Sequence, residues 1–391
     1  MPTLSDILTH EGENREQYFH AIAPPVIQTS NFAFDSVESM RNAMTDELSH
    51  HIYTRGNNPT VEILRKKIAL LEHTEDALVT GSGAAAIAAA VIANVGQGDH
   101  IICVQKPYSW TYKLISQFLP RFGVSFTFVD GTDTADIERA IQTNTKVLFL
   151  ESPNSLTFEI QDLNACSRLA KQHSIVTIID NSHASPVFQN PSDAGIDIVV
   201  HSATKYINGH SDVVAGAICS SHAMIDKIFR SEIMTLGMTI SPHDAALMLR
   251  GLRTLPLRVR QSDASARILA DYLYNHPAIE RMYFPLHPSF PQFELASKQM
   301  SGCGGLITVR LKAPDKESVL QVISNIRKFL IAVSWGGYES LMIPSIVFHD
   351  MPGLPDSPIH WSTIRFYVGL EDAEELQADL DQALSILVRD K

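Results

Sequence analysis

Cysteine is scarce in this sequence, and basic residues are outnumbered by acidic ones. The 391 residues include four cysteines, Cys103, Cys166, Cys219 and Cys303, and no two of them form a CxxC pair. This spacing argues against a disulfide framework and against a structural zinc site, and it fits a reducing cytoplasm. The formal net charge is -12, and no run of lysines and arginines stands out. Nucleic acid and anionic membranes are therefore disfavoured as partners.

Long hydrophobic runs are also missing. The longest, AAAIAAAVIA (84–93), is rich in alanine and covers about half of the ~20 residues that a membrane helix needs. The N-terminal stretch MPTLSDILTHEGENREQ is polar and has no apolar core flanked by basic residues, so it does not look like a secretory signal. The sequence thus predicts a soluble cytoplasmic protein.

The length of the chain and the changing pattern of apolar residues along it predict three parts. Because single hydrophobic cores stop growing at roughly 250–300 residues, a chain of 391 residues suggests two or more domains. Residues 1–55 have weak periodicity and two adjacent prolines, so we expect an arm with a short helix or two that packs on something. Residues 56–250 alternate between helical and strand-like segments, and residues 251–391 are predicted to form a smaller α+β domain.

Short apolar runs of β-forming residues recur through the middle part. Continuous apolar strands separated by helical lengths are typical of a parallel sheet that is covered on both faces. A ligand is expected at the carboxyl ends of such strands. The predicted strands lie in residues 77–83, 100–104, 125–129, 146–151, 174–180 and 197–202.

The last part begins with a predicted long helix, GLRTLPLRVRQSDASARILADYL, and continues with strand-like segments at 305–311 and 363–370. A final amphipathic helix is predicted because apolar residues recur there on one face. These residues are Leu376, Leu380, Leu384, Leu387 and Val388.

Three features of the middle part could together bind pyridoxal 5'-phosphate. The glycines of GSG (81–83) offer free backbone N–H groups at a helix start, although a simple strand-to-helix turn explains them equally well. Asp180 ends an apolar strand, where a charge needs a cationic partner or acts as a cap. Lys205 follows the next strand in the polar stretch HSATKYINGHSD, whereas an isolated lysine is most often a solvated surface residue. A lysine, an aspartate and a phosphate cradle suit this cofactor, with its aldehyde on the lysine as a Schiff base and its ring nitrogen facing the aspartate.

The segment SATKYINGHSDVVAGA (202–217) resembles the lysine motif of the Cys/Met-metabolism enzymes that use pyridoxal phosphate, the group of cystathionine γ-synthases, γ-lyases and β-lyases. Matching blocks follow one another from about residue 50 to the end: YTRGNNPT, GSGAAAI, ESPNS, IIDNSHA, RGLRTLPLRVRQ, SWGGYESL and IRFYVGLED. The resemblance implies an α/β fold of the PLP-dependent transferase fold type I. That fold has a mostly parallel central sheet flanked by helices in the cofactor-binding domain (56–250) and a smaller C-terminal α+β domain (251–391).

The resemblance also implies a role for individual residues. Lys205 would carry pyridoxal phosphate as a Schiff base, Asp180 would face the ring nitrogen, and Tyr108 would stack on the ring and help to move protons. The phosphate would be bound by Gly83, Ala84, Ser202 and Thr204, and by Tyr53 and Arg55 of a neighbouring subunit. Arg365 would grip the substrate carboxylate, with Ser334 and Trp335 beside the substrate. No metal is implied.

The roles of Tyr53 and Arg55 make a homodimer obligatory, and the family's usual assembly is a tetramer. The arm (1–55) would contact that neighbouring subunit. Two positions depart from the family pattern. Ser109 and Trp110 replace two glycines after Tyr108, and Asn57 stands where the family usually has glycine, although asparagine tolerates a left-handed backbone.

The stretch SWGGYESL (334–341) resembles the bacterial cystathionine β-lyase version, because γ-enzymes commonly have leucine where Trp335 stands. We therefore expect a carbon–sulfur β-lyase of methionine biosynthesis that splits L-cystathionine into homocysteine, pyruvate and ammonia. The γ-chemistry of the same family, on cystathionine, methionine or an activated homoserine, stays open, as does cysteine desulfhydration. A catalytically silent binding protein is disfavoured by the presence of both Lys205 and Asp180. A metal enzyme is disfavoured because His50 and His51 are adjacent, and His201 and His210 lack nearby partners in the sequence.

Overall fold

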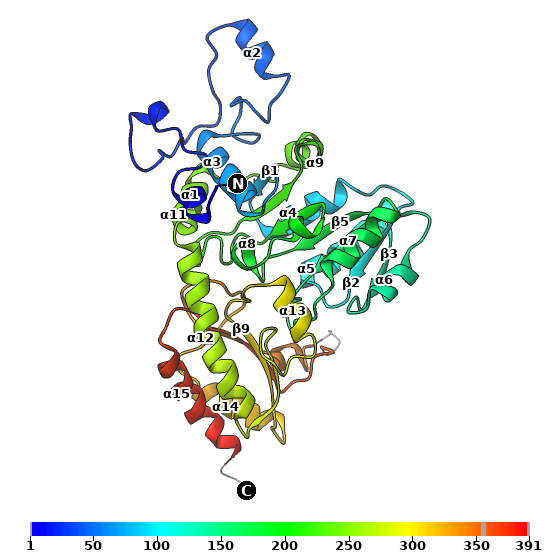
Figure 1. Ribbon diagram of the computed structural model, residues 1–391, viewed down its shortest axis with the longest axis vertical. Coiled ribbons are helices and arrows are strands. Elements are labelled where there is room, and N and C mark those ends of the chain that lie inside the picture. The colour runs from blue at the N-terminus through cyan, green and yellow to red at the C-terminus, as the bar shows by residue number, and fades with distance from the viewer. Residues whose placement is uncertain (1, 353–356, 389–391) are drawn as a thin grey trace.

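The computed structural model describes residues 2–352 and 357–388 and contains two β-sheets joined by a long helix (Figure 1). The seven-stranded sheet has the order β1-β7-β6-β5-β4-β2-β3. Strands β2 to β6 run parallel, and β7 pairs antiparallel with both β6 and β1. The strands are β1 (Asp76–Thr80), β2 (His100–Val104), β3 (Ser125–Val129), β4 (Thr145–Glu151), β5 (Val176–Asp180), β6 (Ile198–His201) and β7 (Gly216–Ser220).

These strands confirm the mostly parallel sheet predicted from the apolar runs. The six predicted runs each contain one strand, and β7 is the strand that the pattern missed. The central strands are buried along almost their whole length because helices cover both faces of the sheet, whereas the edge strand β3 has exposed residues. The carboxyl ends of β4, β5 and β6 lie together on one edge, toward the second sheet.

Local sequence explains where the covering helices begin. Helix α4 (Gly83–Ile92) consists mainly of alanine, the best helix former, and the Ser82 side chain caps it by accepting a hydrogen bond from Ala85 N at 3.1 Å. Helix α3 (Pro59–Leu71) has Asn58 at its N-cap and proline at its first position. The other helices around this sheet are α5 (Ser109–Lys113), α6 (Thr134–Ala140), α7 (Leu163–Gln172), α8 (Ser185–Phe188) and α9 (His222–Ile228).

The five-stranded sheet has the order β10-β11-β12-β9-β8. Its strands are β8 (Ile279–Tyr283), β9 (Leu306–Leu311), β10 (Leu330–Ile331), β11 (Leu341–Pro344) and β12 (Thr363–Tyr367). The helices beside it are α12 (Leu255–Asn275), α13 (Phe293–Gln299), α14 (Lys316–Asn325) and α15 (Ala373–Leu384). Figure 1 shows α12 running along one side of the molecule, from the level of the large sheet to the far end of the small one.

Two details of the predicted C-terminal part are wrong. The stretch expected as one long helix from residue 251 contains the end of α11 (Pro242–Leu252) and then α12, because the chain turns at Arg253 and Thr254. Helix α15 ends at Leu384, so Leu387 and Val388 lie beyond it, and Val388 is 38% exposed. Leu376, Leu380 and Leu384 are buried, as the amphipathic pattern predicts. The division of the chain at residues 55 and 250 stays a prediction.

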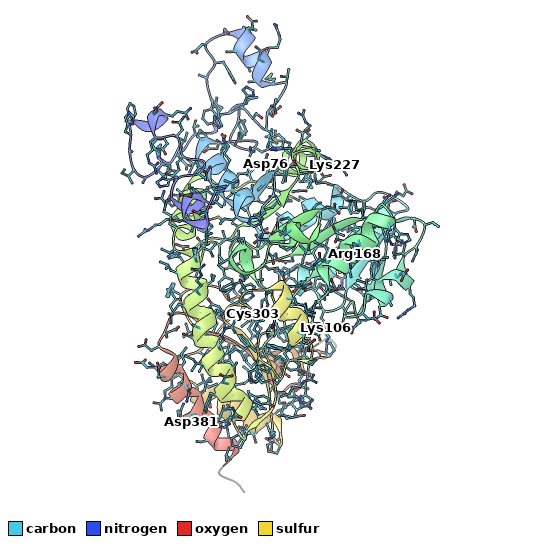
Figure 2. All side chains as sticks on the ribbon, in the orientation of Figure 1. Asp76, Lys106, Arg168, Lys227, Cys303 and Asp381 are labelled. Carbon is cyan, nitrogen blue, oxygen red and sulfur yellow. The ribbon has the colours of Figure 1, made fainter. Side chains whose placement is uncertain are left out.

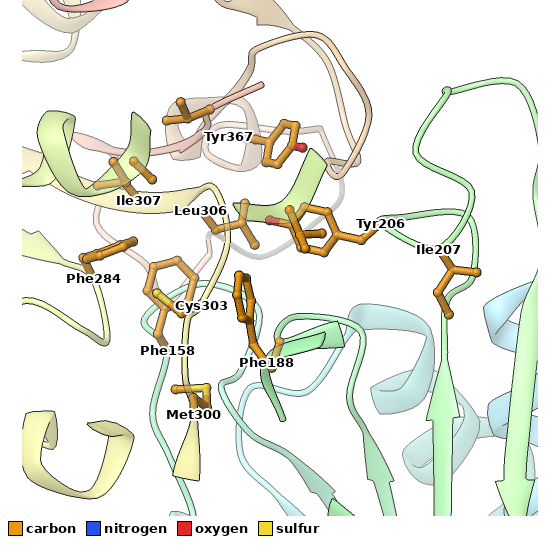
Figure 3. Close-up of a cluster of buried hydrophobic side chains, with 14 of the residues drawn as sticks. Phe158, Phe188, Tyr206, Ile207, Phe284, Met300, Cys303, Leu306, Ile307 and Tyr367 are labelled. Atoms are coloured by element: carbon orange, nitrogen blue, oxygen red, sulfur yellow. The ribbon is translucent and has the colours of Figure 1, made fainter. Parts of the chain in front are cut away.

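An apolar core joins the two sheets beside the lysine motif. Phe158, Phe188 and Tyr206 come from the large-sheet side and pack against Cys303, Leu306 and their neighbours from the other side (Figure 3). Gly305 N donates a hydrogen bond of 2.7 Å to the Tyr206 hydroxyl. Since Tyr206 directly follows Lys205, this contact fixes the lysine relative to the second sheet. Figure 2 likewise shows Cys303 at the junction of the two halves, far from Asp76 and Asp381.

The N-terminal arm is anchored at its start and projects farther along. It contains α1 (Leu4–Thr9), a short 3-10 helix (Arg15–Tyr18) and α2 (Val37–Ala43). The buried Lys67 donates to Ile7 O at 2.8 Å and pairs with Glu13 at 3.2 Å. In Figure 1, α2 stands away from the rest of the chain. Phe19 is 98% exposed and Val37 is 75% exposed, so this arm presents apolar surface.

All four cysteines are buried and free. Among residues 2–352 and 357–388, no helix combines the length and the apolar character that crossing a membrane requires.

Candidate active site

Two carboxylates end neighbouring strands of the large sheet. Glu151 of β4 and Asp180 of β5 are paired in the parallel register, and both are buried. Asp180 Oδ1 accepts hydrogen bonds from Ser182 N at 2.9 Å and from Ser182 Oγ at 2.5 Å. Ser182 Oγ in turn accepts from Ser202 N at 2.6 Å. Burial raises the pKa of Asp180, and the Ser182 hydrogen bonds oppose that rise. The side chain is therefore fixed at the strand end, where a cationic group would hold it ionised.

Lys205 lies in the turn after β6 and contacts the second sheet. Its Nζ donates to Ser334 Oγ at 2.5 Å and lies 5.6 Å from the centre of the Trp335 ring. The pKa of Lys205 is lowered to about 8, mainly by burial and next by the charge of Arg365, while the charge of Asp180 opposes the shift. An amine with this pKa is partly neutral near pH 7, so it can act as a nucleophile and as a base. The polar surroundings predicted for Lys205 thus include Ser334, which is distant in sequence.

The loop that carries Ser334 packs directly on the lysine. Ser334 has a left-handed backbone with φ 83°, which costs a residue with a side chain about 1–2 kcal/mol. Gly336 (φ 87°) lies so close that a Cβ there would stand 2.9 Å from the carbonyl carbon of Lys205. The Trp335 ring lies 5.3 Å from that of Tyr206. Contacts with the lysine turn therefore hold the strained loop in place.

Arg365 of β12 lies in the same site. Its Nη1 donates to Ser155 O at 3.0 Å, and its Nη2 donates to Ser334 O at 3.4 Å. Burial lowers the pKa of Arg365 to about 10, and the nearby Glu151 opposes this shift. The guanidinium stays positive at neutral pH, and its planar fork suits a carboxylate.

The start of α4 lies against Ser202. A Cβ at Gly83 would stand 2.8 Å from Ser202 Cα, so only glycine allows this close approach. Ser82 Oγ already binds Ala85 N, and within the described ranges no hydrogen bond is recorded for the amides of Gly83 and Ala84. These amides and the Ser202 hydroxyl form a place for an anion at a helix N-terminus.

The Thr204 hydroxyl bonds to Ala215, just before β7, and its contact with a phosphate stays a prediction. It donates to Ala215 O at 3.1 Å and accepts from Ala215 N at 3.0 Å. A hydroxyl has one proton to donate, so binding a phosphate through it would require this donor to change partner. The contact shows that Thr204 braces the turn that contains Lys205.

Tyr108 lies at the N-terminus of α5. Its backbone N donates to Glu151 Oε2 at 2.7 Å, and the side chain is 40% exposed. Burial raises the pKa of the Tyr108 phenol, as do the charges of Asp180 and Glu151. These charges act on the phenol because it lies near the two carboxylates, and its position beside the cofactor ring stays a prediction.

Tyr53 and Arg55 lie apart from this cluster. Tyr53 is 46% exposed, and the Arg55 guanidinium lies over its ring at 5.1 Å. In the parts of the chain that the structure describes, no recorded hydrogen bond or ion pair joins either residue to Lys205, Asp180 or Ser202. Their role in binding a neighbouring subunit's phosphate stays a prediction.

Sequence reasoning missed three polar residues of the site. Glu151 and Ser182 lie beside Asp180, and Ser155 lies beside Arg365. Glu151 could have been found, because it ends an apolar strand as Asp180 does. His201 has no partner close in sequence, but its Nε2 lies 2.5 Å from the buried Glu72 Oε1, a residue 129 positions away.

The residues present fit pyridoxal phosphate. The Lys205 amine, whose pKa is lowered, suits the aldehyde of this cofactor. The buried Asp180 suits its ring nitrogen, and the free amides at the start of α4 suit its phosphate. Arg365 adds a carboxylate-binding group on the side of the second sheet.

Comparisons with known proteins agree with this arrangement. Residues 5–385 match the model of the family described as Cys/Met metabolism PLP-dependent enzymes. An L-methionine gamma-lyase from Treponema denticola is 38% identical over 387 residues, which cover 97% of this chain and 96% of that protein. The cystathionine beta-lyase MetC from Bacillus subtilis is 34% identical over 391 residues, covering 98% and 96%. The crystal structure of metB from Corynebacterium glutamicum superposes with a TM-score of 0.92 at 31% identity, covering 99% of each chain.

Proposed function

Since the chain belongs to the family of Cys/Met metabolism PLP-dependent enzymes, we propose that it is a carbon–sulfur lyase acting on a small sulfur-containing L-amino acid. The observation that carries this proposal is the position of the Lys205 amine. It lies at the carboxyl ends of the parallel strands, hydrogen-bonded to Ser334 and influenced by the charges of both Asp180 and Arg365. A base, an electron-withdrawing cofactor and a carboxylate-binding group can all meet there.

Each residue then has a role in an elimination. Pyridoxal phosphate, when bound, withdraws electrons from the substrate α-carbon and so makes its hydrogen acidic. Asp180 would hold the ring nitrogen protonated, and Gly83, Ala84 and Ser202 would hold the phosphate. Thr204 would join them once its hydroxyl releases Ala215 O. Arg365 would orient the substrate carboxylate, with Ser334 and Trp335 beside it. Lys205, the residue expected to hold the cofactor covalently, would take the α-proton after the substrate amine has displaced it and freed its own amine.

The leaving sulfur needs a proton as its bond to carbon breaks. Lys205 can return the proton that it took from the α-carbon, and the Tyr108 phenol is a second donor near the two carboxylates. In β-elimination from L-cystathionine the Cβ–S bond breaks, homocysteine leaves, and water converts the three-carbon fragment to pyruvate and ammonia. This reaction removes one carbon-bound proton, so a single amine base suffices. We therefore take cystathionine β-lyase activity, a step toward methionine, as the first candidate.

A second candidate is γ-elimination from methionine. It is favoured by the 38% identity to the L-methionine gamma-lyase from Treponema denticola, which exceeds the 34% identity to the Bacillus subtilis cystathionine beta-lyase. γ-Elimination also requires removal of a proton from Cβ, so the amine must act twice. Cystathionine γ-cleavage and cysteine desulfhydration would use the same residues.

The experiment that separates these reactions supplies purified protein and pyridoxal phosphate with L-cystathionine or with L-methionine. The keto acid and the thiol are identified by mass. Pyruvate with homocysteine supports the first candidate, and 2-oxobutyrate with methanethiol from methionine supports the second. No keto acid from either substrate would contradict the proposal, provided that L-cystine and L-cysteine are also inert.

We further propose a cytoplasmic homo-oligomer, at least a dimer and by family resemblance a tetramer. The support is the arm, whose apolar side chains are exposed and whose α2 stands away from its own chain. In such an assembly Tyr53 and Arg55 would reach the phosphate held by the neighbouring copy.

A further inference from the structure

Glu151 joins two loops that approach the site from different parts of the chain. Its Oε2 accepts from Tyr108 N at 2.7 Å, at the entry to α5. Its Oε1 accepts from Ser155 Oγ at 2.5 Å, in the loop that follows β4. The residue is 5% exposed, so both contacts are shielded from water. One buried carboxyl group thus fixes both loops relative to the end of β4.

The Ser155 contact continues to the arginine. Ser155 O accepts from Arg365 Nη1 at 3.0 Å, while Arg365 Nη2 donates to Ser334 O. The guanidinium is therefore held between the large-sheet loop and the second-sheet loop. Displacing Ser155 would remove one of these two supports and allow the fork to turn.

A glutamate is unexpected at position 151, because Asp180, the residue paired with it on the neighbouring strand, is also acidic. Two carboxylates at adjacent strand ends repel each other in a buried place. Burial, with the charge of Asp180 next, raises the pKa of Glu151 to about 8. A neutral carboxyl group can keep both contacts: its carbonyl oxygen accepts from Tyr108 N, and its hydroxyl becomes the donor to Ser155 Oγ, which reverses the direction of that hydrogen bond. A glutamine side chain has the same pattern, with a carbonyl oxygen and an NH₂ donor.

We propose that Glu151 is a positioning residue that holds Tyr108 and, through Ser155, Arg365 in the geometry required to bind the amino-acid carboxylate beside the cofactor. This inference rests on the proposed function for the roles of Tyr108 and Arg365. In this proposal Glu151 acts through its contacts with Tyr108 and Ser155. A purely structural glutamate at this place would affect folding stability and would not distinguish ligands that have a carboxylate from ligands that lack one.

The test compares two amines that lack a leaving group and so cannot undergo elimination, L-alanine and ethylamine, which differ by the carboxylate. Each is titrated into the holoprotein while the absorbance of the bound cofactor is followed, so no turnover is needed. In Glu151→Ala the dissociation constant for L-alanine should rise about tenfold or more, and that for ethylamine by less than about threefold. Glu151→Gln should stay within about threefold of wild type for both ligands, since the amide keeps both contacts. Glu138→Gln, an exposed residue of α6, is the matched control and should leave both constants unchanged.

Equal binding of L-alanine by Glu151→Ala and wild type would overturn the proposal. An equal rise of both dissociation constants would also overturn it, because this would indicate a general structural role. The same holds if the absorbance of the wild-type protein does not respond to L-alanine. If Glu151→Ala does not fold, Ser155→Ala is used in its place. This variant should weaken the binding of L-alanine and leave the binding of ethylamine unchanged. Unchanged dissociation constants for both ligands would overturn the proposal. Failure of the proposed lyase function is a separate result, because it appears as absent keto acid and thiol from the wild-type protein.

Discussion

The amine of Lys205 donates a 2.5 Å hydrogen bond to Ser334 Oγ, although 129 positions separate the two residues in sequence. Lys205 follows the last parallel strand of the large sheet, and Ser334 belongs to the loop between β10 and β11 of the small sheet. The site therefore exists only when both sheets are in place. The apolar core around Tyr206 and Leu306 fixes this arrangement (Figure 3).

Replacing Lys205 with alanine should abolish turnover while the fold survives. The amine is the group that we expect to take the α-proton, and a positioned base contributes about 100- to 10,000-fold to a rate. The loss should reach at least the upper end of this range, because the covalent hold on the cofactor disappears too. Keto acid release, with circular dichroism as the control for folding, measures the effect. An active Lys205→Ala protein would refute the assignment.

Covalent loading of the apoprotein with pyridoxal phosphate should depend on pH. Only the neutral amine attacks an aldehyde, and the pKa of Lys205 is lowered to about 8, mainly by burial. The loading rate should rise about tenfold from pH 6 to pH 7 and level off above about pH 8, whereas an ordinary lysine would keep gaining up to about pH 10. Stopped-flow absorbance measures this rate. A plateau that begins only near pH 10 would show that the lysine is not perturbed.

Gly336→Ala should both destabilise the protein and lower its activity. A Cβ there would lie 2.9 Å from Lys205 C and 2.8 Å from Tyr206 N, in addition to the strain of a left-handed backbone. We expect a loss of about 3 kcal/mol in the free energy of unfolding, measured with urea. Gly98→Ala is the control: it has a similar φ of 89° but nothing within 4 Å, so it should cost about 1 kcal/mol and leave activity intact. Equal effects of the two variants would contradict the packing argument.

Lys67→Met should loosen the start of the N-terminal arm. The Lys67 side chain is 1% exposed and joins Ile7 O to Glu13, so its loss removes a buried partner. We expect about 2–3 kcal/mol of destabilisation, limited because Arg15 and Arg253 still pair with Glu13. Limited proteolysis within residues 1–20 should become faster. Lys66→Met, whose side chain is 50% exposed, should change stability by less than about 1 kcal/mol. Similar proteolysis of both variants would argue against this anchor.

Local patterns were sufficient to predict much of the large sheet. Strand β2 matches the run HIICV, because buried parallel strands are apolar throughout. The edge strand β3 matches SFTFV, which is rich in β-forming residues although partly exposed. The end of β5 placed Asp180 correctly at the edge of the sheet. The same pattern missed β7, GAICS, whose glycine, alanine and serine are poor β-formers and whose place between β1 and β6 depends on tertiary pairing.

Contacts between distant segments could not be predicted from local patterns. The bonds from Lys205 to Ser334 and from Arg365 to Ser155 join segments that are 129 and 210 positions apart. The partnership of His201 with Glu72 was missed for the same reason. The family resemblance implied roles for single residues, but it did not predict that the Thr204 hydroxyl would donate its hydrogen bond to Ala215 O.

The assignment of Lys205 as the lysine that holds the cofactor can be tested directly. Holoprotein is treated with borohydride, which reduces a lysine–cofactor linkage to a stable amine, and the modified peptide is located by mass spectrometry. We expect a single phosphopyridoxyl group, on Lys205. Modification of another lysine, or no modification with Lys205 intact, would contradict the site from which every role above is derived.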